Sequence, residues 1–322
     1  MRTLKRDLTE RWFSAPSAGL WRLSAAKYWV AHGTFKSVPG LFRQMFTIEG
    51  SCPPNHDVAF PLLYVLMTSK SEMLYREILA KVSEMANEID IDLNPEVILT
   101  DFEKAMINAF KSEFPESRQV GCFFHLSKNW WKYVQQNHLI EKFNRNVHLY
   151  SFYKKLQALA FLPVSKIPDA FSNLKSSAPS ELDGIFKYVE ETYVLGREKS
   201  SKKSRRSSST DPLFPPSLWS IYENTLNNIP RTTNQIEAWH GSWNTLVSSN
   251  AGVNEIINEL RSEEKYTTGQ IEAHSAGVVN KKRKTVSEIT DVKLRKIVQN
   301  LKNYTVQSFL DAIAASLGTK AK

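Results

Sequence analysis

Asp101, Cys122 and His125 lie in one stretch of the chain, and their side chains are able to do acid, nucleophilic or metal-binding chemistry. Asp101 directly follows a short apolar run rich in β-branched residues, 96–100, which predicts a buried strand. A carboxylate at the carboxyl end of such a strand is where α/β proteins place ligands and metal ions. Cys122 and His125 form a C-x-x-H pair where a second predicted strand, 119–124, meets a helical pattern.

Each of these residues also has a purely structural explanation. Asp is a favoured helix N-cap, and Thr100 with Glu103 fits a capping box, so Asp101 either starts a helix or binds a ligand. Cys122 and His125 are either a functional pair or a buried thiol and a core imidazole. One Cys/His pair supplies only two of the four ligands of a closed zinc site, and the chain has 2 cysteines. The composition therefore argues against a structural zinc site.

The charge of the chain indicates a polyanionic partner. Lys and Arg number 42 and Asp and Glu 33, which gives a net charge of +9. Clustered cations bind polyanions favourably because they neutralise phosphates and release counterions, so nucleic acid is the simplest partner. Two basic runs, 197–206 and 281–284, are either phosphate contacts or nuclear localisation signals, or are solvated loops. The first run supplies the candidate DNA contacts Lys202, Lys203, Arg205 and Arg206, and we expect a nuclear location.

Other classes of protein are disfavoured. With 42% hydrophobic and 11% aromatic residues the chain is globular. No apolar run reaches the roughly 18 to 20 residues that span a bilayer, and the first residues lack the apolar core of a signal peptide. Two cysteines favour a reducing, intracellular setting over a disulfide scaffold. We therefore expect no membrane partner and no small-molecule substrate.

The first half of the chain predicts a meander followed by alternating helices and strands. Three extended runs, 27–36, 41–49 and 58–67, precede a long amphipathic helix that Ser69 and Glu72 are expected to cap. Pro39-Gly40 predicts a turn that makes the first two runs an antiparallel hairpin. Pro61 in the third run indicates an edge strand or a bulge.

The second half is predominantly helical. A Ser-, Lys- and Arg-rich loop at 196–216 interrupts it, and two amphipathic helices around 294–301 and 306–317 end it. In the segment 231–240, Glu237 and His240 share a polar flank at helical spacing with Asn244. Glu237 has an alternative role as the capping-box partner of Asn234.

These residues resemble a known family, the Mutator-like element (MULE) transposases, which are related to bacterial insertion-sequence transposases with a DDE acid triad. The matching segments are AHGTFKSVP at 31–39, LTDFEKA at 99–105, FPESRQVGCFFH at 114–125, LQALAFLP at 156–163 and RTTNQIEAWH at 231–240. They stand in family order and cover most of residues 20–265.

The resemblance and the order of the elements together imply an α/β fold. It is a ribonuclease H-like mixed sheet flanked by helices, interrupted by an all-α insertion and followed by a helical C-terminal tail. The expected domains are a lead segment (1–25), the transposase core (26–137 and 228–250), a helical insertion (138–227) with its basic loop (197–216), and a helical C-terminal region (251–322).

The resemblance assigns the second acid of the triad to Asp101, the third to Glu237 and the family's C-x-x-H motif to Cys122 and His125. It implies Mg²⁺ or Mn²⁺ as cofactor and DNA as substrate, and it is compatible with a homo-oligomer. The implied reaction is metal-dependent DNA cleavage followed by strand transfer. Arg231 and His240 are expected to touch phosphate or to orient Glu237. Members of the family also often carry an N-terminal zinc-binding module that helps to recognise element ends. The residues ahead of the first predicted strand show no such module, so we expect weak selectivity for DNA sequence.

One position departs from the family, since His32 stands where the first triad acid is expected. Hard divalent cations prefer carboxylate oxygens, whereas imidazole is a softer, neutral ligand. Losing a carboxylate that bridges two metal ions is expected to impair catalysis severely. Two alternatives follow: a non-catalytic DNA- or protein-binding product of a decayed or domesticated element, and a zinc-dependent enzyme that uses His32, Cys122 and His125.

Overall fold

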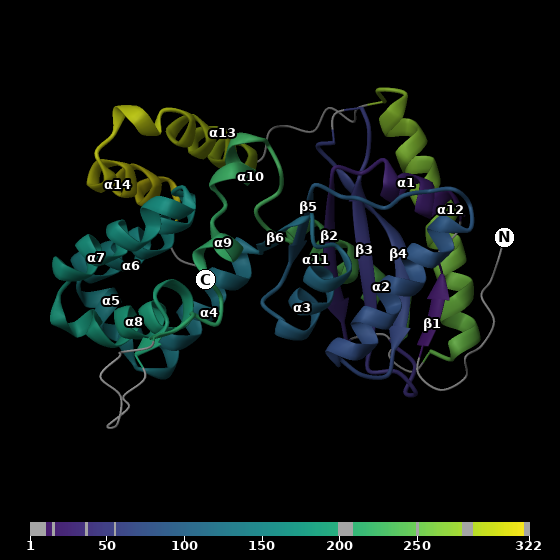
Figure 1. Ribbon diagram of the computed structural model, residues 1–322, viewed down its shortest axis with the longest axis horizontal. Helices are drawn as coiled ribbons and strands as arrows, with labels where there is room; N and C mark the ends of the chain where they lie inside the picture. The colour runs from purple at the N-terminus through teal and green to yellow at the C-terminus, as the bar shows by residue number, and fades with distance from the viewer. Residues whose placement is uncertain are drawn as a thin grey trace. The chain divides into compact units, whose positions relative to one another are not determined.

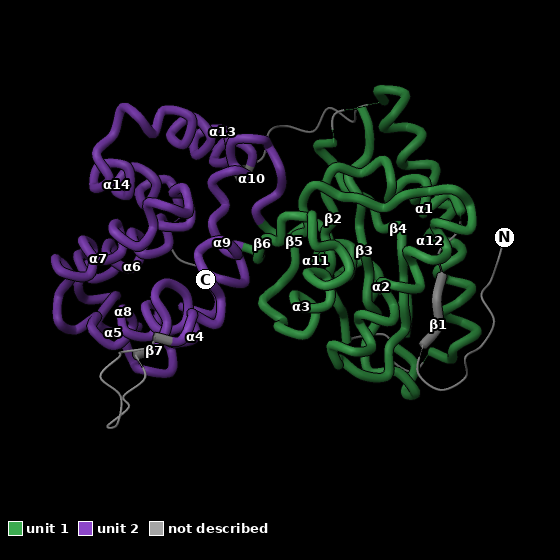
Figure 2. The backbone as a smooth tube through the Cα atoms, in the orientation of Figure 1, with its two compact units in different colours: residues 1–122, 232–281 green, residues 123–231, 282–322 purple. Residues whose placement is uncertain are grey.

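The computed structural model describes residues 11–14, 17–35, 38–54, 56–198, 209–248, 251–278 and 286–318. The chain forms two compact units, each built from two separate segments (Figure 2). Unit 1 comprises residues 1–122 and 232–281, and unit 2 comprises residues 123–231 and 282–322.

Apolar and β-branched runs make a mixed sheet in unit 1. Its strands are β1 (Arg11–Ser14), β2 (Tyr28–Thr34), β3 (Gln44–Ser51), β4 (Ala59–Met67), β5 (Val97–Thr100) and β6 (Arg118–Gly121), in the order β1-β4-β3-β2-β5-β6. Strands β2, β3 and β4 form the expected antiparallel meander, and β5 and β6 extend it in parallel from β2. The predicted turn is confirmed, because the amide of Phe42 donates to the carbonyl of Pro39 at 2.8 Å.

Helices cover both faces of this sheet. They are α1 (Ser17–Ser24), α2 (Glu72–Asn87), α3 (Lys104–Glu113), α11 (Asn234–Leu246) and α12 (Val253–Ser275). Apolar residues of α2 and α3, among them Ile78 and Phe110, pack with Phe46 of β3 on one face. On the other face Trp243 of α11 and Leu260 of α12 pack with alternate strand residues. Figure 1 shows α2 and α3 in front of the strands. The α/β mixed sheet flanked by helices is thus confirmed.

Two local predictions need correction, and a third is decided between its two alternatives. Ser71, not Ser69, caps α2, because its hydroxyl accepts the amide proton of Leu74 from the position just before the helix. The second buried strand ends at Gly121 and α4 begins at Phe123, so the apolar residues at 123 and 124 belong to a helix. Pro61 marks a bulge and not an edge: the register shifts beside it, and β4 lies between β1 and β3.

Unit 2 is helical. It contains α4 (Phe123–Gln136), α5 (Leu139–Arg145), α6 (Val147–Ala158), α7 (Ile167–Ser176), α8 (Asp183–Val189), α9 (Pro216–Trp219), α10 (Tyr222–Leu226), α13 (Val286–Gln299) and α14 (Val306–Ser316), with a short β7 (Arg197–Glu198) and β8 (Ser209–Thr210) pair. Buried aromatic residues hold its helices together; the rings of Trp130 and Trp219, for example, meet edge to face at 6.0 Å. The two expected C-terminal amphipathic helices are α13 and α14.

The two compact units have other bounds than the expected domains, and the domain assignment itself stays a prediction. The sequence-based core ended at 137, whereas α4 packs with the helices of unit 2 from residue 123 on. The sequence-based tail began at 251, whereas α12 belongs to unit 1 and only α13 and α14 to unit 2. Periodicity marks where helices lie along the chain, but it carries no information on which core receives their apolar faces.

Candidate active site in unit 1

His32 lies on β2, half-buried and directly opposite Thr47 of β3. Side chains alternate along a strand, so His32 faces the side of the sheet that α11 and α12 cover. Gly33 beside it leaves room for a buried side chain of the next strand, because a Cβ there would lie 2.5 Å from the side-chain oxygen of Gln44 and would make that side chain move. The sheet therefore fixes the backbone on which the imidazole stands.

The His32 imidazole faces a second imidazole on α11. The Nδ1 atoms of His32 and His240 lie 3.3 Å apart, and the ring centroids 5.2 Å. Burial, and next the neighbouring His32, lower the pKa of His240 to about 3, so this ring is neutral at physiological pH. At this distance a single proton lies between the two Nδ1 atoms, so one imidazole donates the hydrogen bond and the other accepts it.

Glu237 lies in the first turn of α11, one helical turn before His240. The hydroxyl of Thr233 lies 3.1 Å from Oε1 of Glu237 and donates to it, and the partial positive charge of the helix N-terminus favours a carboxylate there. A carboxylate oxygen of Glu237 and a ring nitrogen of His32 lie within 4.8 Å of each other, close enough for one cation to reach both. The expected capping box with Asn234 is not formed, because Thr233 is the N-cap residue and Asn234 is already helical.

Two side chains of helix α11 form hydrogen bonds to other elements of unit 1. The side-chain amide of Gln235 donates to the carbonyl of Ala59 at 2.7 Å, and the indole nitrogen of Trp239 donates to Glu263 of α12 at 2.6 Å. These bonds hold the helix over the sheet face that carries His32, and with it the carboxylate of Glu237.

Asp101 follows β5 as the sequence predicted, half-buried at the strand end. Its Oδ1 accepts the amide proton of Glu103 at 2.9 Å, just before α3 begins at Lys104. The expected N-cap role of Asp101 is not observed: Glu103 occupies the N-cap position of α3 without a side-chain capping bond, and the Asp101 side chain closes a local turn two residues earlier. The Thr100 hydroxyl donates to the Asp101 carbonyl and forms no capping box. In the described part of the chain, no three His, Cys, Asp or Glu ligand atoms within 4.8 Å of one another include Asp101. Its role as a metal ligand stays a prediction.

The two residues of the C-x-x-H motif lie on either side of the junction between β6 and α4. Cys122 is fully buried, and its sulfur lies 3.3 Å from the amide nitrogen of Thr233. His125 lies in the first turn of α4, half-buried, in unit 2. Gly121 precedes them because a Cβ there would lie 2.6 Å from the ring of Phe102.

The other candidate residues have different surroundings. Arg231 belongs to unit 2, where it forms an ion pair with Asp291 of α13 and lies over the ring of Phe161 at 5.6 Å. Burial lowers the pKa of Arg231, and the carboxylate of Asp291 opposes that shift. A DNA contact by Arg231 stays a prediction. Lys202, Lys203, Arg205 and Arg206 lie outside the described residues.

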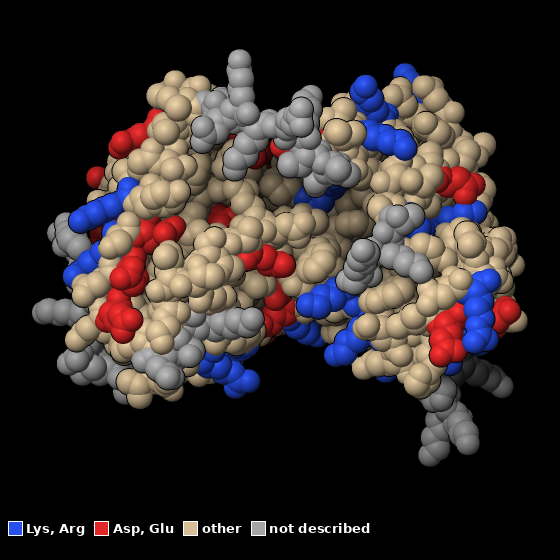
Figure 3. All heavy atoms as spheres, turned by 180° about the vertical axis from the view of Figure 1, so that it is seen from behind, with Lys and Arg blue, Asp and Glu red and all other residues tan. Residues whose placement is uncertain are grey.

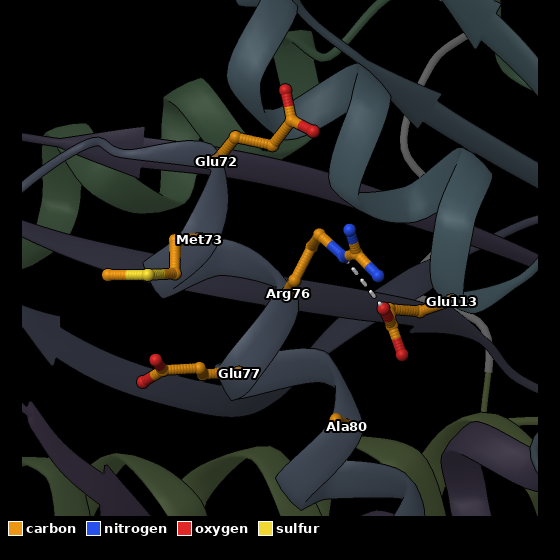
Figure 4. A pocket seen from close by; sticks show the side chains of 6 residues that line it. All are labelled: Glu72, Met73, Arg76, Glu77, Ala80 and Glu113. Atoms are coloured by element: carbon orange, nitrogen blue, oxygen red, sulfur yellow. Dashed lines mark hydrogen bonds and ion pairs between the residues drawn. The ribbon is translucent and has the colours of Figure 1, made fainter.

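The face of the molecule in Figure 3 and the hollow in Figure 4 do not point to another site. On the face shown in Figure 3, blue Lys and Arg side chains are interspersed with red Asp and Glu side chains, so the net charge of +9 is not gathered into one visible patch. The hollow in Figure 4 lies on α2 and α3, where Arg76 pairs with Glu113 at 3.1 Å. Its lining contains no predicted site residue.

The fold and the site define a class of protein: an α/β protein with a mixed sheet. One face of the sheet presents an imidazole, and a late helix packed on that face presents a carboxylate. Residues 28–129 match the family model of the MULE transposase domain, and the chain therefore carries a MULE transposase domain. The match confirms the resemblance to the Mutator-like transposases. It includes His32, Asp101, Cys122 and His125, while Glu237 lies beyond it.

A comparison with curated proteins found no match to the chain. None of the described helices is both long and apolar enough to cross a membrane.

Sequence reasoning missed two residues of this site. Thr233 was part of a matched segment but received no role, although its position just before a helix is a signal for a cap. Glu49 lies on β3, on the same sheet face as His32; its burial depends on the pairing of three strands, for which the sequence of β3 offers no local signal.

Proposed function

We propose that this protein is a transposase-derived DNA-binding protein whose strand cleavage and strand transfer are impaired. The observation that carries the proposal is His32: the β2 position expected to supply a bridging carboxylate holds an imidazole, and that imidazole is engaged by His240 at 3.3 Å. The strand order, with a meander extended by two parallel strands, supports a ribonuclease H-like core.

The donor atoms decide which metal chemistry is compatible with this site. Two Mg²⁺ ions in a transposase site activate the attacking oxygen and stabilise the leaving oxygen, and they need carboxylates to bridge them. His32 and Glu237 provide one nitrogen and one carboxylate within 4.8 Å. This set does not fit a carboxylate-bridged ion pair, and it fits a single divalent ion that accepts mixed nitrogen and oxygen ligands, such as Mn²⁺.

DNA binding follows from charge. The excess of 9 cations favours duplex DNA through counterion release, with affinity that falls steeply with salt. Binding of a fluorescent duplex, followed by anisotropy at increasing salt, measures this directly. Equal affinity for unrelated duplexes is the expected result.

The catalytic part is tested by restoring the acid. The assay joins a pre-cleaved duplex with a free 3′-hydroxyl to a plasmid in the presence of Mn²⁺. We expect the wild-type protein to form no more product than the Asp101→Asn variant does. His32→Asp is expected to raise product formation by at least tenfold, and the double variant His32→Asp with Glu237→Gln to abolish the gain.

Two outcomes contradict the proposal in different ways. Robust Asp101-dependent product from the wild-type protein would show that chemistry survives with histidine at position 32. A folded His32→Asp variant without product would show that more than the first acid is lost, which favours the non-catalytic alternative.

A further inference from the structure

Cys122 joins two parts of unit 1 that are 111 residues apart in the chain. Its sulfur lies 3.3 Å from both the amide nitrogen and the hydroxyl oxygen of Thr233, the N-cap residue of α11. Both residues are completely buried. The sulfur thus lies against the residue from which the helix that carries Glu237 begins.

The protons in this group can be assigned. The Thr233 hydroxyl has one proton and lies 3.1 Å from Oε1 of Glu237 and 3.3 Å from the sulfur. A carboxylate is the stronger acceptor, so the hydroxyl donates to Glu237 when that residue is ionised. The sulfur then accepts the Thr233 amide proton, and the thiol proton is available to the hydroxyl oxygen, since a thiol is a weak donor and a weak acceptor.

We propose that Cys122 is a positioning residue that acts through Thr233 to fix the carboxylate of Glu237. The part that concerns metal affinity rests on the proposed function, in which Glu237 holds a divalent ion. The cysteine of the C-x-x-H motif thereby orients a ligand and is not one itself. In agreement, the described residues contain no group of three candidate ligand atoms within 4.8 Å of one another that includes Cys122.

The second cysteine of the chain, Cys52, is a buried thiol for which we propose no positioning role. Cys52 is 1% exposed, and its sulfur donates to the carbonyl of Gly50 at 3.7 Å, two residues away. This contact is local and ties no distant element. Cys52 is therefore a matched control for the loss of a buried thiol in the same unit.

The test measures Mn²⁺ affinity by calorimetry in Cys122→Ala, Cys122→Ser and Thr233→Val. Loss of a partner that orients a ligand typically costs 10- to 100-fold in metal affinity, and we expect losses in that range for Cys122→Ala and Thr233→Val. Cys122→Ser keeps a donor and an acceptor and is expected to recover most of the affinity. Cys52→Ala is expected to bind Mn²⁺ as the wild type does.

A double-mutant cycle separates positioning from general destabilisation. In a Glu237→Gln background, Cys122→Ala is expected to cause no further loss of Mn²⁺ affinity, because the residue it positions is already altered. An undiminished loss in that background, or wild-type affinity in Cys122→Ala, would overturn the proposal.

Hydrogen exchange keeps the test independent of the proposed function. In metal-free protein the amide of Thr233 and the first turn of α11 are expected to exchange faster in Cys122→Ala than in the wild type or in Cys52→Ala. If the wild type binds no Mn²⁺, the proposed metal site fails, while unchanged exchange in Cys122→Ala would refute the positioning role itself.

Discussion

The two faces of the sheet in unit 1 are packed in different ways. Against α2 and α3 the strands present mainly apolar side chains; the polar Gln44 donates to the hydroxyl of Tyr75 at 2.7 Å, while its Oε1 has no hydrogen-bond partner among the described residues. Against α11 and α12 the sheet and the helix bury polar side chains as well. Among the described residues, Tyr28, Thr47, Glu49, His240 and Trp243 each bury a polar atom that has no hydrogen-bond partner there.

The two faces of the sheet therefore contribute differently to the stability of the fold and to the candidate site. A buried polar atom without a partner costs free energy, so a face that collects several of them is not optimised for stability. That face also carries His32 and lies under the helix that holds Glu237. The apolar face stabilises the sheet, and the polar face bears the site.

The strongest test of the comparison is truncation on the apolar face. Phe110 of α3 is fully buried against Phe46 and Phe114, with ring centroids 6.4 and 6.2 Å away. Phe110→Ala is expected to reduce the free energy of unfolding by about 3–5 kcal/mol, because it removes a large apolar contact and leaves a cavity. Urea denaturation measures the loss; a value below about 1 kcal/mol would contradict the assignment of this face as the stabilising one.

A second test uses pH and the polar face. Glu49 lies on β3 diagonal to His32 on the same face, and burial raises the pKa of its carboxyl to about 8. The folded state therefore holds a proton that the unfolded state releases above its ordinary pKa of 4.5. The stability that this proton contributes is complete below about pH 4.5 and is lost as pH rises through about 8.

Glu49→Gln removes that titration. We expect the urea midpoint of the wild type to fall relative to that of Glu49→Gln between pH 5 and pH 8, by an amount that corresponds to a few kcal/mol. Both proteins keep the opposite contribution of His240, whose lowered pKa increases stability as pH rises towards 6.5. Glu255→Gln, at an exposed position of α12, is the matched control and should keep the wild-type slope. Parallel pH curves for wild type and Glu49→Gln would show that Glu49 is ionised in the folded protein.

The test with the smallest expected effect compares a buried threonine hydroxyl that has no hydrogen-bond partner among the described residues with one that has a partner. Thr47→Val replaces a buried hydroxyl without a hydrogen-bond partner by a methyl group, and it is expected to raise the free energy of unfolding by up to about 1 kcal/mol. Thr100→Val is the control, because the Thr100 hydroxyl donates to the carbonyl of Asp101 at 2.9 Å and its loss should destabilise by about 1 kcal/mol. Equal destabilisation by both substitutions would mean that Thr47 has a partner in solution.

The sequence revealed those parts of the fold that depend on neighbouring residues. The strand before Asp101, the Pro39-Gly40 turn and the amphipathic helix α2 are local patterns, and the structure has them where they were predicted. The bulge at Pro61 follows from the missing amide proton of proline, which is also a local property.

Contacts between distant residues were beyond the sequence. Nothing near His32 in the chain indicates that His240, 208 residues later, would lie 3.3 Å away. The motif pair Cys122 and His125 suggested a common role, but it gave no indication that the sulfur of Cys122 would contact Thr233, 111 residues later. Metal binding by Asp101 and Glu237 and phosphate contact by Arg231 are still predictions, and the experiments on His32 address the first of them.

The division of each unit into two chain segments has a consequence for synthesis. The sheet of unit 1 is complete once residue 121 has been made, but α11 and α12 follow only after the whole of 123–231. Until then the polar sheet face with His32 and Glu49 has no helix to cover it. Synthesis of the intervening roughly 110 residues takes on the order of 10 seconds at typical rates, and during this time the face stays uncovered. A chain truncated before α11 is therefore a candidate for chaperone binding and aggregation.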